Sequence, residues 1–218
     1  MPAAPPSLAS FNRQLGLATA DLAGGDPVMA ELISAHGPCE LGGHREDRTH
    51  FAALCQSVVY QQLAGRAAAA IYGRFCDAVG GEHPTAEGVL ALGEADLRAV
   101  GLSGAKTRCL TALAGAVASG DVSLEDVERY SDEELISQLC VVHGIGRWTA
   151  EMFLMFQLWR LDVWPVGDFG VRKGYARAYG LAEAPAPKAL MALGERFRPW
   201  RSVAAWYCWR AAETVVPA

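Results

Sequence analysis

A glycine-rich turn between two predicted helices is the first feature of this sequence that could do chemistry. Gly144 and Gly146 flank Ile145, after an apolar segment that ends at Val142 and before an amphipathic helix that begins near Arg147. Glycine suits a turn that needs positive φ or a close approach by a ligand. The first N–H groups of a helix are unpaired and lie at its positive dipole end. The turn is therefore predicted to bind an anion such as phosphate, although it could simply connect two helices.

A single carboxylate, Asp168, follows the second glycine by 22 residues and is the second feature. It comes after a break at Pro165 and Gly167 and directly before a predicted helix, 169–179. This is the position of an N-cap, which is a common structural role for Asp. A helix N-terminus also stabilises the charged form of a carboxylate. Asp168 is therefore predicted to cap the helix, and it could at the same time serve as an ionised catalytic group.

The elements that must position these residues are predicted to be helices. Residues 49–60 carry apolar side chains at the i, i+3, i+4 and i+7 spacing of a helix with one buried face. Ser131 and Glu134 form a capping box before the segment that leads into the glycine turn. No convincing period-2 strand pattern occurs, so the predicted fold class is all-α. Residues 1–10 are predicted to be disordered, and helices are expected within 11–22, 27–36, 49–60, the Ala-rich stretch to 79, 85–92, a segment ending at 101, 103–118, a short segment from 123, 131–142, 147–161 and 169–179. A last helix or pair of helices is expected over 188–215.

Composition sets limits on the class of protein. The chain has 218 residues, enough for one domain or two closely joined lobes. Half of the residues are apolar, but no run is long enough to span a bilayer, and the N-terminal segment lacks the features of a secretory signal. Six scattered cysteines form no close pair typical of a zinc or redox site, so free, buried thiols are expected. We expect an intracellular protein that is not secreted and has no membrane contact.

The charge is distributed unevenly along the chain. The net charge is −5, yet residues 140–210 contain ten Lys or Arg and five Asp or Glu. Such a basic segment can form a binding face for phosphates on an acidic protein. The alternative is that these basic residues are solvated or paired with acids. An acidic protein that binds nucleic acid is expected to do so modestly and with a marked dependence on salt.

Three sequence blocks resemble one protein family. Gly144-Ile-Gly-Arg-Trp-Thr-Ala150 followed by Asp168 is similar to the hairpin motif and catalytic Asp of the helix-hairpin-helix (HhH-GPD) DNA glycosylase superfamily, in particular the AlkA/Mag-type 3-methyladenine DNA glycosylase II branch. The block Phe-Ala-Ala-Leu-Cys-Gln-Ser-Val-Val-Tyr-Gln-Gln-Leu at 51–63 and the block Trp-Arg-Ser-Val-Ala-Ala-Trp-Tyr-Cys-Trp at 200–209 also resemble that branch. Together they cover most of residues 45–215.

The resemblance implies a fold of two helical lobes with a DNA-binding cleft between them. Residues 1–45 and 161–218 would make one discontinuous lobe, and residues 46–160 the central lobe, which ends in the helix-hairpin-helix at about 135–160. The chain resembles the short form of the branch, which lacks an additional N-terminal α/β domain.

The resemblance also implies roles in holding DNA. Backbone N–H groups of Gly144, Gly146 and Thr149 would bind phosphate, and Arg172 is a further phosphate-contact candidate. Leu63, with Gln62 beside it, matches the intercalating wedge, a side chain that fills the space left by an extruded base. The alternative for Leu63 is a core position at a helix junction.

Four residues are predicted to line the pocket for the extruded base. Trp148, Trp209 and Tyr60 would stack on it, because an electron-rich ring attracts a cationic, alkylated base. Met152 stands where some relatives have an aromatic residue, which implies a wider or less stacked pocket. Most of the remaining aromatic and Met residues near Trp148 are expected to be core.

Asp168 is the predicted catalytic residue. The glycosidic bond breaks with positive charge on the sugar, which an ionised carboxylate stabilises while it orients or deprotonates water. Trp148 occupies the position of the nucleophilic Lys of lyase-competent relatives, so a monofunctional enzyme is expected. Alternatives are a non-catalytic helix-hairpin-helix DNA-binding protein, a bifunctional glycosylase/lyase, and an all-α binder of small molecules or proteins.

Cofactor and partner expectations follow from the same resemblance. No cofactor is expected to be required, but the backbone carbonyls of Cys140, Val142 and Ile145 match the positions that hold a monovalent cation in the family. An iron–sulfur cluster is not expected, since the C-terminal region has only Cys208. The partner would be double-stranded DNA with alkylated bases, bound by a monomer in the nucleoid-containing cytoplasm or, in a eukaryote, the nucleus.

Overall fold

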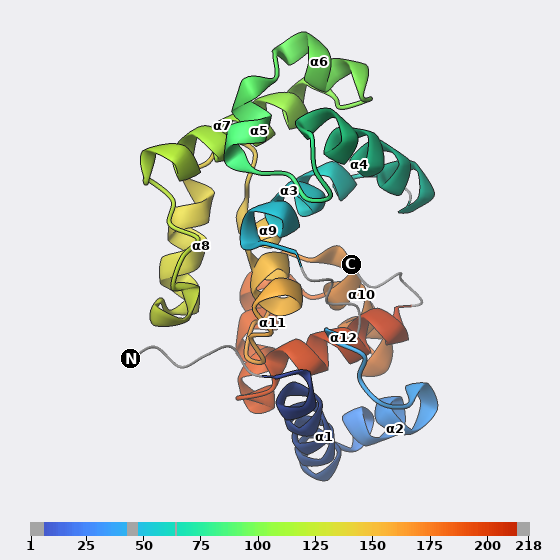
Figure 1. The fold of residues 1–218 in the computed structure, drawn as a ribbon. Coiled ribbons are helices and arrows are strands. Elements are labelled where there is room, and N and C mark those ends of the chain that lie inside the picture. The colour runs from blue at the N-terminus through green and yellow to red at the C-terminus, as the bar shows by residue number, and fades with distance from the viewer. Residues whose placement is uncertain (1–6, 43–47, 64, 213–218) are drawn as a thin grey trace. The chain divides into compact units, whose positions relative to one another are not determined.

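The computed structural model describes residues 7–42, 48–63 and 65–212 (Figure 1). Within these ranges the regular elements are helices and no strand occurs, which confirms the all-α prediction. No helix among the described residues is long and apolar enough to cross a membrane.

The described residues divide into two compact units. Residues 48–153 form one, which we call the central unit, and residues 7–42 together with 154–212 form the other, which we call the terminal unit. The sequence predicts that the chain returns to the terminal lobe at residue 161, whereas the division falls at Leu154. This boundary lies inside a π-helix, Phe153–Gln157, which directly continues the helix that follows the glycine turn.

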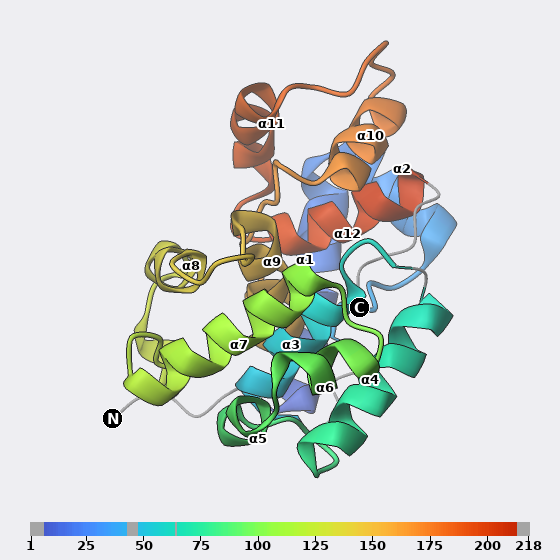
Figure 2. The same ribbon diagram turned by 90° about the horizontal axis from the view of Figure 1, so that it is seen from above.

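The central unit is built around a buried helix, α3 (His50–Tyr60), whose N-cap is Thr49. Helix α7 packs against α3 and is flanked by α5 and α6 (Figure 2). Leu54, Val58 and Leu110 are fully buried in this core. The other elements of the unit are α4 (Gly65–Val79), α5 (Ala86–Ala91), α6 (Glu94–Ala99), α7 (Gly104–Ser119), the 3-10 helix η1 (Val127–Arg129), α8 (Asp132–Cys140) and α9 (Arg147–Met152).

The terminal unit is built around α12 (Arg201–Ala211), which packs against α1, α2 and α10 (Figure 1). Every residue from Ser202 to Trp209 is buried. A helix that is covered on all sides is expected at the centre of a helical core. The other elements are α1 (Leu8–Gly25), α2 (Pro27–His36), the π-helix η2 (Phe153–Gln157) from its second residue on, α10 (Phe169–Ala178), α11 (Pro187–Gly194) and the 3-10 helix η3 (Glu195–Phe197).

Several predicted segments differ from the structure. Residues 8–10, predicted to be disordered, are helical because Ser7 caps α1 with a bond from the N–H of Ser10. The helix expected from residue 123 is only the 3-10 turn η1, which follows Asp126 at a φ of 51°. The helix expected over 147–161 changes to a π-helix at Phe153. The last helix or pair of helices expected over 188–215 consists of α11 and α12 with the 3-10 helix η3 between them, and Pro199 separates η3 from α12 because proline cannot continue a helix. The predicted end at 215 lies outside the described residues.

All six cysteines are free, and five of them are buried. Cys140 is exposed at the end of α8, so the prediction of buried thiols is wrong for this residue.

Candidate functional site

The glycine turn joins α8 to α9 in the central unit. The N–H of Ile145 donates to the carbonyl of Val142 over 3.0 Å, and both side chains are buried. Gly144 has a φ of 93°, and a Cβ added there would lie 2.8 Å from Cβ and Sγ of Cys109. This glycine is therefore required both for its left-handed backbone conformation and for its close approach to α7.

Gly146 has a different role from Gly144. Its φ is −96°, and an added Cβ would meet nothing within 4 Å. Gly146 is the N-cap of α9, and no side chain caps this helix. The leading backbone N–H groups of α9, including that of Thr149, thus have no side-chain acceptor from the N-cap residue. Their predicted role in phosphate binding stays a prediction.

Arg147 at the start of α9 is held by two carboxylates of the same unit. Its Nε lies 3.0 Å from Oε1 of Glu151, which is only 3% exposed, and its guanidinium also pairs with Glu133 on α8. The hydrogen bond from Arg147 lowers the pKa of Glu133. Arg147 therefore ties α8 to α9 across the turn.

The predicted wedge lies in the turn that follows α3. Leu63 is 39% exposed, and its N–H donates to the carbonyl of Tyr60 over 3.3 Å. Gln62 is exposed and has a φ of 56°, a conformation that non-glycine residues rarely adopt. Gln61 donates from Nε2 to Oγ1 of Thr149 over 3.0 Å, so the structure brings the wedge turn and the helix after the glycine turn together.

Lys106 is a residue of this region that sequence reasoning missed. It lies on α7, and its Nζ donates to the carbonyls of Val59 and Gln61, each over 2.8 Å. Partial burial lowers the pKa of its ammonium group. The sequence offers no signal for this contact, since the partners are backbone carbonyls 47 and 45 residues away.

The base-pocket candidates of the central unit differ in exposure. Trp148, the second residue of α9, is 37% exposed. Tyr60 is half-buried, with its ring edge against Tyr72 at a centroid distance of 6.4 Å. Met152 is 4% exposed and belongs to the core. Trp148 is therefore the most accessible of the three, and the stacking roles stay predictions.

Asp168 lies in the terminal unit and is the N-cap of α10, as predicted. Its Oδ1 accepts two hydrogen bonds, each of 2.8 Å, from the N–H of Val171 and from Nε1 of Trp209. The residue is only 8% exposed. Two donors on one oxygen hold this carboxylate in one orientation.

Trp209 has a contact that the sequence does not predict. It is 1% exposed and stacks on Phe156, with ring centroids 6.0 Å apart and planes inclined by 27°. Stacking of its ring on a base would need the surrounding side chains to move. Its indole N–H instead holds Asp168.

Two glycines on α10 allow this contact. A Cβ on Gly170 would lie 2.8 Å from Cδ1 of Trp209 and 3.1 Å from Oδ1 of Asp168. A Cβ on Gly174 would lie 1.7 Å from the carbonyl oxygen of Cys208. Sequence reasoning missed both glycines, although their spacing of four residues could have indicated a close helix crossing.

Arg172, the predicted phosphate contact on α10, already makes one structural bond. Its Nε donates to the carbonyl of Pro185 over 2.7 Å and so fixes the loop after α10. A phosphate contact would have to use the remaining N–H groups of the guanidinium.

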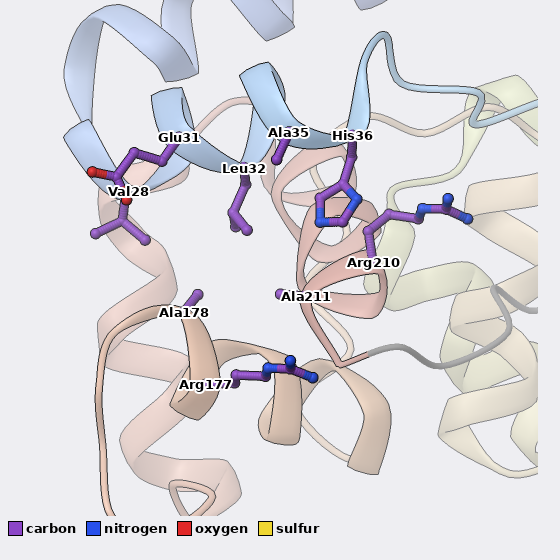
Figure 3. A pocket seen from close by; sticks show the side chains of 9 residues that line it. All are labelled: Val28, Glu31, Leu32, Ala35, His36, Arg177, Ala178, Arg210 and Ala211. Carbon is purple, nitrogen blue, oxygen red and sulfur yellow. The ribbon is translucent and has the colours of Figure 1, made fainter.

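A cavity of about 350 Å³ lies in the terminal unit, along α2 and at the C-terminal ends of α10 and α12 (Figure 3). His36, Arg177 and Arg210 contribute basic groups to its lining. Asp168 caps the opposite end of α10, so this cavity is not assigned to the predicted site.

The chain is similar in sequence to known proteins of one family. Residues 55–199 match the model of the HhH-GPD superfamily base excision DNA repair protein. DNA-3-methyladenine glycosylase 1 of Schizosaccharomyces pombe is 36% identical over 194 residues, which cover 88% of this chain and 85% of that protein.

Solved structures agree with this match. The 3-methyladenine DNA glycosylase of Schizosaccharomyces pombe in complex with abasic DNA has a TM-score of 0.78 and 35% identity, covering 88% of this chain and 95% of that one. The DNA-3-methyladenine glycosidase of Bacillus halodurans has a TM-score of 0.80 and 34% identity, covering 90% of this chain and 89% of that one. The family model covers more than half of the chain, and the chain therefore belongs to the HhH-GPD superfamily of base excision DNA repair proteins.

Proposed function

We propose that this protein is a monofunctional DNA glycosylase, which extrudes alkylated purines such as 3-methyladenine from duplex DNA and hydrolyses the N-glycosidic bond. The observation that carries the proposal is the arrangement of Asp168, a buried N-cap carboxylate whose Oδ1 accepts from Val171 and Trp209. Relatives that cover most of the chain are named for release of 3-methyladenine, which supports the same substrate class.

The chemistry needs one ionised carboxylate. A purine methylated at N3 or N7 is already cationic, so it leaves with the electron pair of the C1′–N bond and needs little help from a general acid. Positive charge then develops on the sugar, and Asp168 stabilises it electrostatically. Water adds to C1′, and its proton passes to the carboxylate or to solvent. The products are the free base and an intact strand with an abasic site.

Extrusion of the base is assigned to the central unit. Leu63 and Gln62 would fill the vacated space in the duplex. Trp148 would offer its ring to the cationic base, and Tyr60 is the second candidate for stacking. The exposure of Leu63 and Trp148 supports both assignments.

The glycine turn is assigned to the DNA backbone. The N–H groups of Gly144, Gly146 and Thr149 would bind phosphate, which positions the protein without reading sequence. The carbonyls of Cys140, Val142 and Ile145 would hold a monovalent cation, since uncharged carbonyl oxygens suit an ion of low charge. The carbonyl of Val142 already accepts from Ile145 and has a second lone pair for this role. The cation would add positive charge near the phosphate.

Three further properties belong to the proposal. The enzyme lacks lyase activity, because Trp148 occupies the position at which lyase-competent relatives have a nucleophilic Lys. It acts as a monomer and needs no iron–sulfur cluster. It works wherever the cell keeps its DNA, which is the nucleoid or the nucleus.

The test is single-turnover release of base from a duplex that contains one 3-methyladenine or one ethenoadenine. We expect release by the wild type and a loss of at least about 100-fold in Asp168→Asn, because the amide removes the charge that the transition state needs. Strand breaks should appear only after alkali.

Two results would contradict the proposal. If the wild type binds DNA in a salt-sensitive way but releases none of several alkylated bases, the protein is a non-catalytic DNA-binding module. If borohydride traps a covalent protein–DNA adduct and strands break without alkali, the enzyme is bifunctional. Circular dichroism of Asp168→Asn must match the wild type, since the substitution also alters an N-cap.

A further inference from the structure

The turn of residues 61–63 is fixed by hydrogen bonds to two other helices, a donor on α7 and an acceptor on α9. Helix α3 ends at Tyr60, and the last carbonyls of a helix have no partner within it. Lys106 Nζ donates to the carbonyls of Val59 and Gln61, each over 2.8 Å. Gln61 in turn donates to Thr149 on α9 over 3.0 Å.

Lys106 is well suited to this contact. Its own backbone is fixed, because its N–H donates to Oγ of Ser103, the N-cap of α7. A positive charge at the C-terminal end of α3 also interacts favourably with the dipole of that helix. The residue is half-buried, and partial burial lowers the pKa of its ammonium group.

The turn needs such a fixed frame. Gln62 adopts a left-handed backbone conformation with a φ of 56°, which residues other than glycine rarely adopt. Gln62 and Leu63 nevertheless remain exposed. A strained turn persists only where its surroundings determine it, and here these surroundings include Lys106 and Thr149.

We propose that Lys106 is a positioning residue for base extrusion, which holds the turn 61–63 so that Leu63 and Gln62 are presented to the duplex before DNA binds. The inference rests on the proposed function, since it deepens the role of the wedge. A preformed wedge avoids the loss of conformational entropy that ordering the turn on DNA would require. Lys106 thus acts through Leu63, and it contacts neither base nor sugar.

The first test compares Lys106→Met, which keeps the aliphatic stem, with Arg108→Met, which removes a charge from an exposed position on the same helix. We expect Lys106→Met to slow single-turnover release of ethenoadenine opposite thymine about tenfold, while affinity for DNA falls no more than in Arg108→Met. The defect should shrink when the lesion lies in a single-nucleotide bulge, because an unpaired base needs less help to leave the stack.

A double-mutant cycle with Leu63→Ala identifies the route of the effect. If Lys106 acts through the wedge, the variant with both substitutions should be about as slow as Leu63→Ala alone. Additive losses, or equal slowing on the paired and the bulged substrate, would overturn the inference. Gln61→Met leaves Lys106 in place and removes the donor to Thr149. This variant should reproduce the defect, and it replaces Lys106→Met in the test if that protein does not fold.

Hydrogen exchange provides a readout that does not depend on activity. The backbone amides of residues 61–63 should exchange faster in Lys106→Met than in the wild type or Arg108→Met, without DNA present. Unchanged exchange would show that Lys106 does not order the turn. Failure of the proposed function is distinct, because then the wild type itself would release no base.

Discussion

At the scale of single residues, the carboxylate of Asp168 is the most constrained group of the predicted site. Oδ1 accepts from a backbone N–H and from an indole N–H, and both distances are 2.8 Å. The first bond is an ordinary N-cap. The second depends on Trp209, which comes from a helix 41 residues further along the chain. An N-cap by itself would need only the first bond, so the second bears on the orientation of the carboxylate.

The indole N–H of Trp209 can be tested by itself. Replacement of Trp209 with 3-benzothienylalanine keeps the size of the ring and removes the N–H. We expect release of base to slow about tenfold or more, because a hydrogen bond to a charged group contributes about 1.5–3 kcal/mol. Single-turnover kinetics and DNA affinity should be measured together. Affinity is expected to stay unchanged, since Trp209 is buried.

Trp209→Phe is the companion variant, which loses both the N–H and part of the ring. If the benzothienyl variant releases base at the wild-type rate while Trp209→Phe is slow and less stable, then Trp209 contributes packing only.

At the scale of elements, the turn between α8 and α9 contains two glycines that look equivalent in the sequence but differ in backbone conformation and surroundings. Gly144 has positive φ and touches Cys109, whereas Gly146 has an extended conformation with open space at its Cβ position. Only the first is required by the fold. The second leaves the backbone at the start of α9 uncovered, as a phosphate contact would need.

This difference predicts opposite results for two alanine substitutions. Gly144→Ala should destabilise the protein by at least about 1–3 kcal/mol, because of the φ value and the contact with Cys109. Gly146→Ala should change thermal stability little. If the uncovered backbone binds phosphate, Gly146→Ala should still weaken binding to undamaged duplex DNA.

Urea unfolding and fluorescence anisotropy are the two measurements. A Gly144→Ala protein as stable as the wild type would contradict the geometry of the turn. A Gly146→Ala protein with unchanged DNA affinity would remove this glycine from the predicted phosphate site.

The crossing of α10 and α12 shows how the packing of two helices creates a contact within the predicted site, the bond from Trp209 to Asp168. Gly170 and Gly174 lie one turn apart on α10, and side chains there would meet Trp209 and the backbone of α12. The close approach of the two helices is what allows Trp209 to reach Asp168. The bond from Trp209 to the predicted catalytic carboxylate therefore depends on glycines that have no chemistry of their own.

At the scale of the whole molecule, the basic C-terminal half is less available for phosphate than its sequence suggests. Of its ten Lys and Arg residues, at least four form ion pairs with carboxylates, namely Arg147, Arg196, Arg198 and Arg201. Asp162 alone accepts from Arg198 and Arg201, so part of the positive charge stabilises the terminal unit. This partly supports the alternative of internal pairing, and binding to DNA is expected to be modest.

The cysteines offer a test of the fold and of the DNA contact together. Cys140 is exposed beside the glycine turn, while burial raises the pKa of Cys39 to about 12 and that of Cys109 to about 11. Iodoacetamide should therefore label Cys140 before the other five, because the thiolate is the reactive form. The labelling reaction is run at alkaline pH, since partial burial also raises the pKa of Cys140. Mass spectrometry then identifies the labelled cysteines.

Excess undamaged duplex should slow the labelling of Cys140 if the turn binds DNA. Salt that dissociates the complex should restore the rate. Early labelling of a second cysteine would contradict the burial described for the fold. Labelling that DNA does not slow, under conditions in which binding is measured independently, would place the DNA contact elsewhere.

The sequence by itself determines the local structure of this protein. The caps Ser131 and Asp168 lie where the sequence predicts them, because an N-cap depends on one side chain and on N–H groups up to three residues away. The all-α class follows from spacing within each segment, and the family follows from motifs of a few residues. Even the capping role of Asp168 is local. These features need no knowledge of how distant segments pack.

Only the tertiary structure decides which distant groups meet. The bonds from Trp209 to Asp168, from Lys106 to Val59 and from Gln61 to Thr149 join residues 41 to 88 positions apart. Helical periodicity tells that a tryptophan is buried, but not whether its N–H faces a carboxylate. The lysine on α7 has an ordinary sequence context, and its role arises because packing places the end of α3 against it. The spacing of the two glycines on α10 can indicate a close helix crossing, but not which helix crosses there.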